Sequence, residues 1–199
     1  MKTWLVVGLG NPGSKYAQHR HNIGFAVVEE LAKRAKVAFN RKRLSPFDAA
    51  QTPLDEAGIG ASSNAFEKVA LIRPHTYMNE SGRAVAKAVK QFGVKPEMIV
   101  IIHDELDIDF AKLRLKFGGG DNGHNGLKSI RASLGTGDFY RVRFGIGRPP
   151  GRQEPQQFVL RPFSALERKS LDVEVIRAAD AVEALLTQGL ERAQNLFNS

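Results

Sequence analysis

Four segments of the chain carry histidine, aspartate and asparagine side chains where strands are expected to end or helices to begin. They are "HRHNIG" (19–24), "RPHTYMNESG" (73–82), "IIHDELD" (101–107) and "GGGDNGHNG" (118–126). A water molecule that attacks a carbonyl must lose a proton to a base, and the carbonyl must be held by hydrogen-bond donors. The residue types in these segments therefore indicate acid–base chemistry supported by side-chain amides.

A fifth segment, "VVGLGNPGSKY" (6–16), places three glycines in the G-x-G-x-x-G spacing of dinucleotide-binding loops. That fingerprint requires a helix at the third glycine and an acidic residue after a second strand, and the sequence offers neither. The order Ser14-Lys15 departs from the phosphate-binding loop, and the chain has no G-x-S-x-G nucleophile motif. We interpret the segment as a loop at the carboxyl end of a parallel strand, where ligands bind in open α/β sheets.

The composition excludes several mechanisms and favours one kind of partner. The chain has 199 residues, 42% of them hydrophobic, which suits one domain spanning residues 1–199. The absence of cysteine excludes disulfides, a thiolate nucleophile and a cysteine-bound metal. The net charge of +8 favours an anionic partner, with nucleic acid preferred over a membrane because no strongly basic amphipathic helix stands out. No signal peptide or long apolar run is recognised, so the cytoplasm is the expected location.

The hydrophobic pattern predicts an α/β fold, a single domain with a mixed, mostly parallel, twisted sheet flanked by helices. The strands are expected at 4–7, 68–74, 98–106, 111–117 and 139–147, and the helices at 21–36, 79–93, 127–134 and from Ser164 onwards. Asn79 is an expected N-cap, Ser164 and Glu167 fit a capping box, and Gly93 ends the second helix. Residues 42–64 lack periodicity and are interpreted as a loop or ragged hairpin, an irregular insertion.

Five ordered motifs resemble those of the bacterial-type peptidyl-tRNA hydrolase family: "VGLGNPGSKY", "RHNIGF", "PHTYMNESG", "HDELD" and "GGGDNGHNGLKSI". The resemblance extends from Trp4 through "RVRFGIGRP" to the C-terminal helix. It implies that activated water hydrolyses the ester between tRNA and a peptide, or another N-blocked aminoacyl group, which recycles tRNA from peptidyl-tRNA released by ribosomes. It further implies peptidyl-tRNA as the partner, no cofactor, no metal, no obligate protein partner, no membrane and a monomer.

The resemblance assigns His21, Asp104 and Asn11 to catalysis. A carboxylate bonded to one ring nitrogen of a histidine fixes its tautomer and supports the charge that forms when the other nitrogen takes a proton from water. His21 also lies at an expected helix N-terminus, where the helix dipole disfavours the imidazolium form. An asparagine amide donates and accepts hydrogen bonds without titrating, so it can orient water or stabilise an oxyanion.

The same resemblance assigns substrate binding to Tyr16, Met78, Asn79 and Asn125. The two amides would hold the peptide or the terminal ribose, while the tyrosine and the methionine would line the cleft near the tRNA end and the peptide. Each assignment has a structural alternative: the asparagines stand where ordinary helix caps are expected, and the other two side chains suit core or rim packing.

Lys116 and Arg143 match a basic pair that the family uses to clamp the 5′ phosphate of tRNA. Two cations on adjacent strands suit a phosphate, although a solvated strand face is the alternative. The sequence departs from the family at His19, where a small hydroxyl residue is common, and residues 42–64 form a longer stretch than usual. His75 stands at a variable position.

Two other functions compete with this interpretation. A metal hydrolase would use ligands from the group His19, His21, His103, Asp104 and His124, but the sequence lacks a compact motif such as H-E-x-x-H. A non-catalytic tRNA- or RNA-binding module would account for the net charge. It would not account for a histidine, an aspartate and three asparagines at strand ends, and no aromatic-rich RNA-binding strand motif is present.

Overall fold

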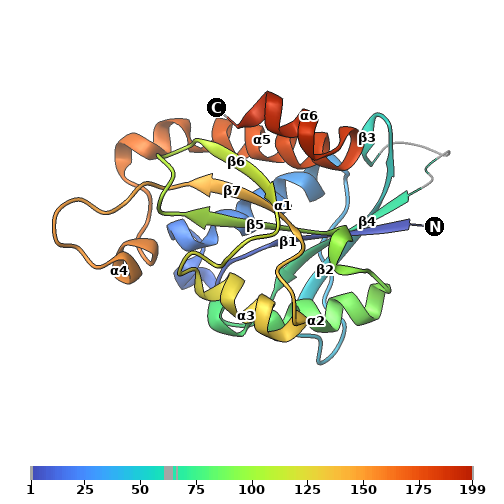
Figure 1. Ribbon diagram of the computed structural model, residues 1–199. Coiled ribbons are helices and arrows are strands. Elements are labelled where there is room, and N and C mark those ends of the chain that lie inside the picture. Colours follow the sequence, from blue (N-terminus) through green and yellow to red (C-terminus); the bar gives the residue numbers. More distant parts are fainter. Residues whose placement is uncertain (1, 61–64, 66, 199) are drawn as a thin grey trace.

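Seven strands form one mixed sheet in the order β3-β2-β4-β1-β5-β7-β6 (Figure 1). The computed structural model describes residues 2–60, 65 and 67–198. Its strands are β1 (Lys2–Gly8), β2 (Phe47–Asp55), β3 (Gly58–Ile59), β4 (Glu67–Pro74), β5 (Ile99–Glu105), β6 (Leu113–Phe117) and β7 (Tyr140–Gly145). The four central strands β4, β1, β5 and β7 run parallel, whereas β2 and β6 pair antiparallel with their neighbours. The predicted α/β fold with a mixed sheet is therefore confirmed.

Helices cover both faces of the sheet (Figure 1). The helices are α1 (Ile23–Arg34), α2 (Ser81–Phe92), α3 (Asn125–Leu134), α4 (Pro155–Val159), α5 (Ala165–Gln188) and α6 (Leu190–Phe197). Short 3-10 turns are η1 (Ser14–Tyr16), η2 (Arg20–Asn22), η3 (Met78–Glu80) and η4 (Pro96–Met98). Helices α1, α5 and α6 lie on one face, and α2 and α3 on the other. No helix within the described part of the chain is long and apolar enough to cross a membrane.

The central strands are buried on both faces, and their side chains contribute to two hydrophobic clusters, one on each face of the sheet. In β5, Val100 and Ile102 pack with α1 and α5, whereas Ile99 and Ile101 pack with α2 and α3. Successive side chains of a strand point to opposite faces, so a strand between two helical layers requires apolar residues at consecutive positions. The chemistry-bearing residues of β5 follow this apolar run and lie at its carboxyl end.

The glycines of the first loop allow α1 to cross very close to β1 and β5. A Cβ atom on Gly8 would lie 2.1 Å from the carbonyl oxygen of Gly24, and one on Gly24 would lie 2.4 Å from the carbonyl oxygen of Ile102. A Cβ on Gly10 would lie 2.8 Å from the Phe25 ring. Two of the three glycines in the G-x-G-x-x-G spacing therefore serve strand–helix packing, which places η2 and the start of α1 beside the end of β5.

Three local predictions are tested by the structure. Ser164 caps α5 together with Glu167, as predicted, and Gly93 ends α2 in the left-handed conformation with φ of 63°. Asn79 does not cap α2: it lies in η3, the helix begins at Ser81, and the flanking residue Glu80 makes no side-chain cap. A 3-10 turn, η3, precedes α2, so Asn79 stands one residue before the N-cap position, which Glu80 occupies.

The irregular stretch predicted at 42–64 contains a regular strand. Residues 47–55 form β2, which pairs antiparallel with β4 along its length, and β3 completes a short hairpin. The loop interpretation is wrong for this strand, and the hairpin alternative is correct for 47–59. Pro53 and the pair Ala49-Ala50 hide the alternation in the sequence, whereas pairing with β4 imposes the strand. Residues 61–64 lie outside the described residues.

Candidate active site

A pocket opens at the carboxyl ends of the central strands, at the end of the sheet from which α4 projects (Figure 1). Four segments that are distant in the sequence line it: η2, which precedes α1, the end of β5, the start of α3, and α4. The lining residues are His21, Asp104, Glu105, Leu106, Asn122, Gly123, His124, Asn125, Pro155, Gln156 and Val159. Three of the predicted site residues, His21, Asp104 and Asn125, therefore share one pocket.

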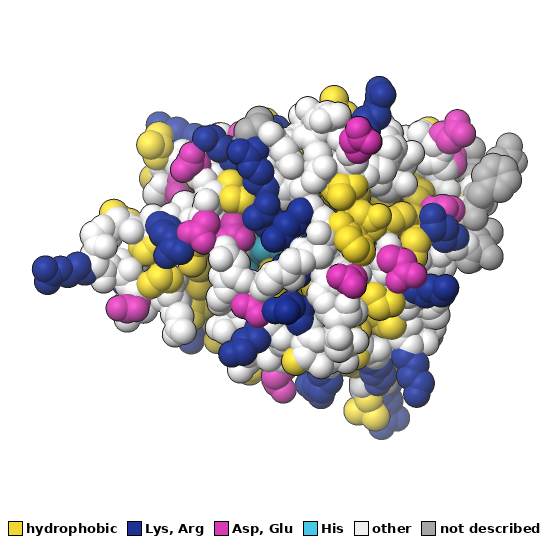
Figure 2. Space-filling model, in the orientation of Figure 1, with side chains coloured by type: hydrophobic (Ala, Val, Ile, Leu, Met, Phe, Trp, Pro, Cys, Tyr) yellow, Lys and Arg dark blue, Asp and Glu magenta, His cyan; other side chains and the backbone are white. Residues whose placement is uncertain are grey.

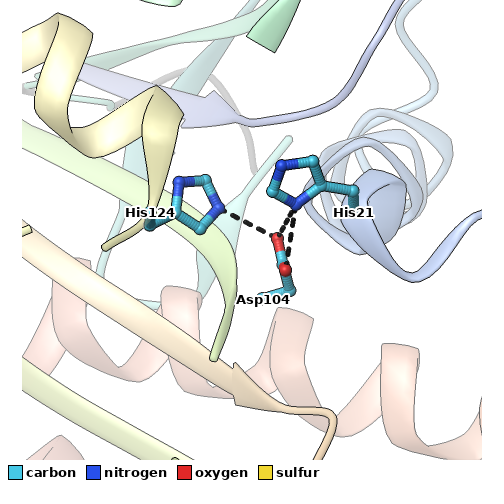
Figure 3. A group of neighbouring side chains, drawn as sticks. All are labelled: His21, Asp104 and His124. Atoms are coloured by element: carbon cyan, nitrogen blue, oxygen red, sulfur yellow. Dashed lines mark hydrogen bonds and ion pairs between the residues drawn. The ribbon is translucent and has the colours of Figure 1, made fainter. Parts of the chain in front are cut away.

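His21 and Asp104 form the expected pair (Figure 3). The Nδ1 atom of His21 lies 2.8 Å from Oδ1 and 3.0 Å from Oδ2 of Asp104, and both residues are buried. An ionised carboxylate only accepts hydrogen bonds, so Nδ1 of His21 carries the hydrogen and donates it. The neutral ring then keeps a lone pair on Nε2, the nitrogen that can accept a proton.

His124 binds the same carboxylate from the other side (Figure 3). Its Nε2 lies 2.9 Å from Oδ1 of Asp104, while its Nδ1 accepts hydrogen bonds from the backbone amides of Gly126 and Leu127 at the start of α3. Because Nδ1 is an acceptor, the hydrogen of a neutral His124 ring must be on Nε2, which donates it to Asp104. His124 thus caps α3 in place of Asn125 and orients the carboxylate toward His21.

The two rings keep Asp104 ionised despite its burial. Burial by itself raises the pKa of the Asp104 carboxyl, but its interactions with His21 and His124, including the hydrogen bonds that both rings donate, outweigh burial and hold the pKa well below its ordinary value. The neighbouring His103 is also buried, and its Nδ1 lies 2.7 Å from the carbonyl oxygen of Asp104. Burial, and then the electrostatic interaction with the neighbouring His124, lower the pKa of His103 well below its ordinary value, so its ring stays neutral.

Asn11 is held by three hydrogen bonds and lines a second pocket together with Asn22, not the pocket of His21 and Asp104. Its Oδ1 accepts a hydrogen bond of 2.7 Å from the backbone amide of Met78, and its own backbone exchanges bonds of 3.0 and 2.9 Å with the side chain of Asn22. The acceptor of the Asn11 amide is therefore used, and its Nδ2 group remains as the donor. The Met78 side chain lies in the core between the sheet and α2, with its sulfur beside Gly126.

The remaining predicted substrate residues are spread around the rim. Asn125 is exposed as the first residue of α3 and lines the pocket, whereas Asn79 is exposed in η3. Tyr16 packs edge-on against His19, with ring centroids 5.5 Å apart, and against Tyr77 at 6.3 Å. The structure thus gathers aromatic rings at η1 and η3, on segments next to those that hold His21 and Asn11.

Lys116 and Arg143 lie on the same face of adjacent antiparallel strands. In the register of β6 and β7, Lys116 is opposite Arg141 and Arg114 is opposite Arg143, which makes Lys116 and Arg143 diagonal neighbours. Figure 2 shows dark-blue side chains in a line over β6 that ends beside a cyan patch of histidine. Within the described residues neither Lys116 nor Arg143 forms a salt bridge, and Arg143 Nε has no hydrogen-bond partner.

Burial and neighbouring cations lower the pKa of both Lys116 and Arg143. Burial, and then the charge of Arg143, lower the pKa of Lys116. Burial and the charge of Arg114 lower the pKa of Arg143, while the buried carboxylate of Glu105 acts in the opposite direction. Arg141 is fully buried and donates to the carbonyl oxygens of Gly119, at 2.6 Å, and of Gly120. It holds the glycine loop, which leaves Lys116, Arg143 and Arg114 as the half-exposed cations of the set.

Sequence reasoning did not assign a supporting role to several of these residues. Asn22, which fixes Asn11, and His124, which shares Asp104, both lie within the quoted motifs, and His124 was considered only as a metal ligand. Glu105 accepts a 2.8 Å hydrogen bond from Asn122 at the pocket edge. Each of them stands next to an assigned residue in the sequence, but the direction of each contact depends on how segments distant in the sequence meet.

Of the five residues considered as metal ligands, the structure brings three together. His21, Asp104 and His124 place ligand atoms within 4.8 Å of one another. The ring of His103 packs against that of His124 with centroids 5.0 Å apart, but its Nδ1 faces the backbone. His19 belongs to the aromatic group at the rim instead.

The fold and the site define a class of protein, a single-domain α/β enzyme in which a histidine–carboxylate pair lies in a pocket at the carboxyl ends of the strands. A family model described as peptidyl-tRNA hydrolase matches residues 5–199. The chain belongs to the peptidyl-tRNA hydrolase family, and it is an enzyme of that family.

Relatives and solved structures agree with this assignment over the whole chain. A peptidyl-tRNA hydrolase of Cutibacterium acnes is 51% identical over 197 residues, which cover 99% of this chain and 98% of the relative. That of Streptomyces coelicolor is 55% identical and covers 98% and 95%. The crystal structure of peptidyl-tRNA hydrolase from Acinetobacter baumannii superimposes with a TM-score of 0.86 at 37% identity, covering 99% and 95% of the two chains.

Proposed function

We propose that this chain hydrolyses the ester bond between tRNA and a peptide or another N-blocked aminoacyl group, and so recycles tRNA from peptidyl-tRNA released by ribosomes. Family membership supports the substrate class. The observation that carries the mechanism is the contact of His21 Nδ1 with Asp104 at 2.8 Å, because it leaves Nε2 as the base. Supporting this role, His21 lines a pocket bordered by Asn125 and α4.

In this mechanism His21 first removes a proton from water and then returns it to the leaving ribose oxygen. Nε2 takes a proton from water, the water oxygen bonds to the ester carbonyl carbon, and the tetrahedral intermediate carries the negative charge on the former carbonyl oxygen. The imidazolium then returns the proton to the ribose oxygen as the ester bond breaks. Asp104 stabilises the imidazolium, and Asn11 Nδ2 is the donor that orients the water or the oxyanion.

We assign the rim to the substrate. Asn125 lines the same pocket as His21 and would hold the ribose or the peptide, with Asn79 acting from η3. Tyr16 would contact the tRNA end, and buried Met78 would act through its backbone contact with Asn11 and through packing. Lys116 and Arg143 would bind the 5′ phosphate, because an anion relieves the repulsion of two half-buried cations that form no salt bridge with any described residue.

We propose that the reaction needs no metal. In the tautomers assigned above, the ring nitrogens that face Asp104 carry hydrogens, and Nδ1 of His124 is occupied by the amides of α3. An ion bound through the ring nitrogens that face Asp104 would have to displace both hydrogens. Turnover that persists in excess chelator supports the proposal, whereas turnover that is lost and restored by added Zn²⁺ would establish the metal alternative.

The oligomeric state, the location and the partners of the enzyme are proposals as well. We infer that the enzyme acts as a monomer in the cytoplasm, without an obligate protein partner and away from membranes. The seven-stranded sheet is covered by helices of the same chain on both faces, so the fold does not need a second subunit to bury its core. Light scattering of the active enzyme should give the mass of one chain, and an obligate dimer would contradict the inference.

Two aminoacyl-tRNA substrates test the proposed activity. We expect ester release from N-acetyl-aminoacyl-tRNA and much slower release from the same tRNA with a free amino group. In water enriched in heavy oxygen, the label should enter the released carboxylate and not the ribose hydroxyl, since the water oxygen bonds to the ester carbonyl carbon. Equal rates on both substrates would reject the N-blocked specificity, and a trapped peptidyl-enzyme would reject direct attack by water.

A further inference from the structure

Arg20, the residue before His21, is buried under the segment that joins α4 to α5. Its side chain is 7% exposed, its Nη1 donates to the carbonyl oxygen of Pro162 at 2.7 Å, and its Nη2 forms a 2.8 Å salt bridge with Glu167. The guanidinium carbon lies 4.0 Å from the ring centroid of Phe158 and 5.4 Å from that of Phe163. One planar group thus contacts α4, the connecting residues and the first turn of α5.

The segment held by Arg20 forms one wall of the catalytic pocket. Pro155, Gln156 and Val159 of α4 line the pocket together with His124 and Asn125. A helix of five residues is far shorter than the about 12–15 residues at which an isolated helix becomes marginally stable, so α4 depends on tertiary anchors. Phe158 faces the guanidinium of Arg20, which makes this contact an anchor of the wall.

Glu167 connects the same anchor to the start of α5. Its Oε2 accepts a 2.6 Å hydrogen bond from the backbone amide of Ser164, as the second half of the capping box, and also receives Nη2 of Arg20. The backbone amide of Arg20 donates to the carbonyl oxygen of Arg161 at 3.0 Å. The turn that carries His21 and the turn that starts α5 are therefore joined by both backbone and side chain.

We propose that Arg20 is a positioning residue that sets the α4 wall of the pocket at a fixed distance from His21. This inference rests on the proposed hydrolysis of peptidyl-tRNA. The guanidinium reaches a carboxylate and a carbonyl oxygen with separate nitrogens while its flat face covers Phe158. A lysine keeps the charge but has neither the fork nor the flat face, so the wall would shift relative to the base.

The test compares Arg20→Lys with Arg34→Lys. Arg34 is the matched control, because it also joins the α1 region to α5, through Asp180, Glu183 and the carbonyl oxygen of Ile176, but far from the pocket. For Arg20→Lys we expect kcat on peptidyl-tRNA to fall about ten- to hundred-fold, since small misplacements at a reacting centre cost this much. The KM should stay unchanged, because the proposed phosphate-binding residues Lys116 and Arg143 lie outside this pocket. Arg34→Lys should keep the wild-type kcat.

A second pair of variants distinguishes loss of the Arg20 contact from general destabilisation of the fold. Glu167→Gln preserves an acceptor for the Ser164 amide but removes the charge that faces Arg20, whereas Ser164→Ala breaks the capping box and leaves the ion pair. We expect kcat to fall in Glu167→Gln and to hold in Ser164→Ala, both measured below their unfolding temperatures. Equal kcat for Arg20→Lys and Arg34→Lys, or for Glu167→Gln and Ser164→Ala, overturns the inference. Absence of ester release by the unmodified enzyme would instead reject the proposed function.

Discussion

Asp104 is the residue on which the arrangement of the site depends, because it accepts hydrogen bonds from His21 and His124 at once. We predict that His21→Ala lowers turnover by about 10²–10⁴-fold, the usual contribution of a general base, and leaves tRNA affinity nearly unchanged. Asp104→Asn should also slow the reaction, since an amide no longer fixes the Nδ1–H tautomer. Single-turnover rates and filter binding measure the two effects separately. Full activity of a folded His21→Ala protein would contradict the base assignment.

His103 predicts a pH dependence of stability that is separate from catalysis. Burial lowers the pKa of its folded form, whereas the unfolded residue titrates near 6.5. Below that pH the unfolded chain binds a proton that the folded protein does not, so the free energy of unfolding falls as pH decreases. The slope from this residue is at most about 1.4 kcal/mol per pH unit.

Urea unfolding between pH 7.5 and 5.5 measures this effect, with His103→Gln as the comparison. We expect the stability of the variant to depend less steeply on pH than that of the wild type. Parallel pH profiles for the two proteins would show that His103 accepts a proton in the folded state.

The close crossing of α1 over β1 and β5 predicts that a side chain added at Gly24 destabilises the protein. Alanine is favoured over glycine inside a helix by about 1 kcal/mol, so Gly24→Ala would stabilise α1 in isolation. In the protein the new Cβ would lie 2.4 Å from the backbone of Ile102 and Leu9. Overpacking costs about 1–3 kcal/mol or more, so we predict net destabilisation and, because η2 moves with α1, lower turnover.

Thermal unfolding and turnover of Gly24→Ala are compared with those of Gly120→Ala. A Cβ atom on Gly120 would meet no atom of the described residues within 4 Å. Stability equal to or above that of the wild type in Gly24→Ala would contradict the close-packing explanation for the glycines.

The elements also show which parts of a fold are encoded locally. Ser164, Glu167 and Gly93 act through their own backbone neighbourhood, so the ends of α5 and α2 were predictable from single residues. Strand β2 is regular because it pairs with β4, about twenty residues further along the chain, and its alanines and proline carry little strand signal. The Asn79 cap failed because a 3-10 turn precedes α2, a detail that cap preference alone does not determine.

At the scale of the molecule, the topology explains why the site could be predicted in part. Strands β1 and β5 are parallel neighbours, so the loops after them must lie at one edge of the sheet, and His21 and Asp104 meet there. The motifs named these residues, but neither the role of Asn22 behind Asn11 nor that of Arg20 under α4 follows from composition. Both depend on contacts between segments whose relative orientation the tertiary fold determines.

Two of the cations behind the net charge of +8 are expected to bind the 5′ phosphate of tRNA. Lys116 and Arg143 lie on β6 and β7, away from the α4 wall, so phosphate binding and ester hydrolysis should separate. Lys116→Ala and Arg143→Ala should raise the KM for tRNA that carries a 5′ phosphate and leave kcat nearly intact. Each should also reduce the slope of log affinity against log salt by about one unit or less.

The decisive comparison for this clamp uses full tRNA with and without its 5′ phosphate. The wild type should discriminate between the two, and the variants should not. Lys112→Ala is a suitable control, because that lysine is exposed near the start of β6 and paired with Asp109, so its loss should leave the discrimination intact. Equal discrimination by the wild type and both clamp variants would reject the assignment and leave the cations as a solvated strand face.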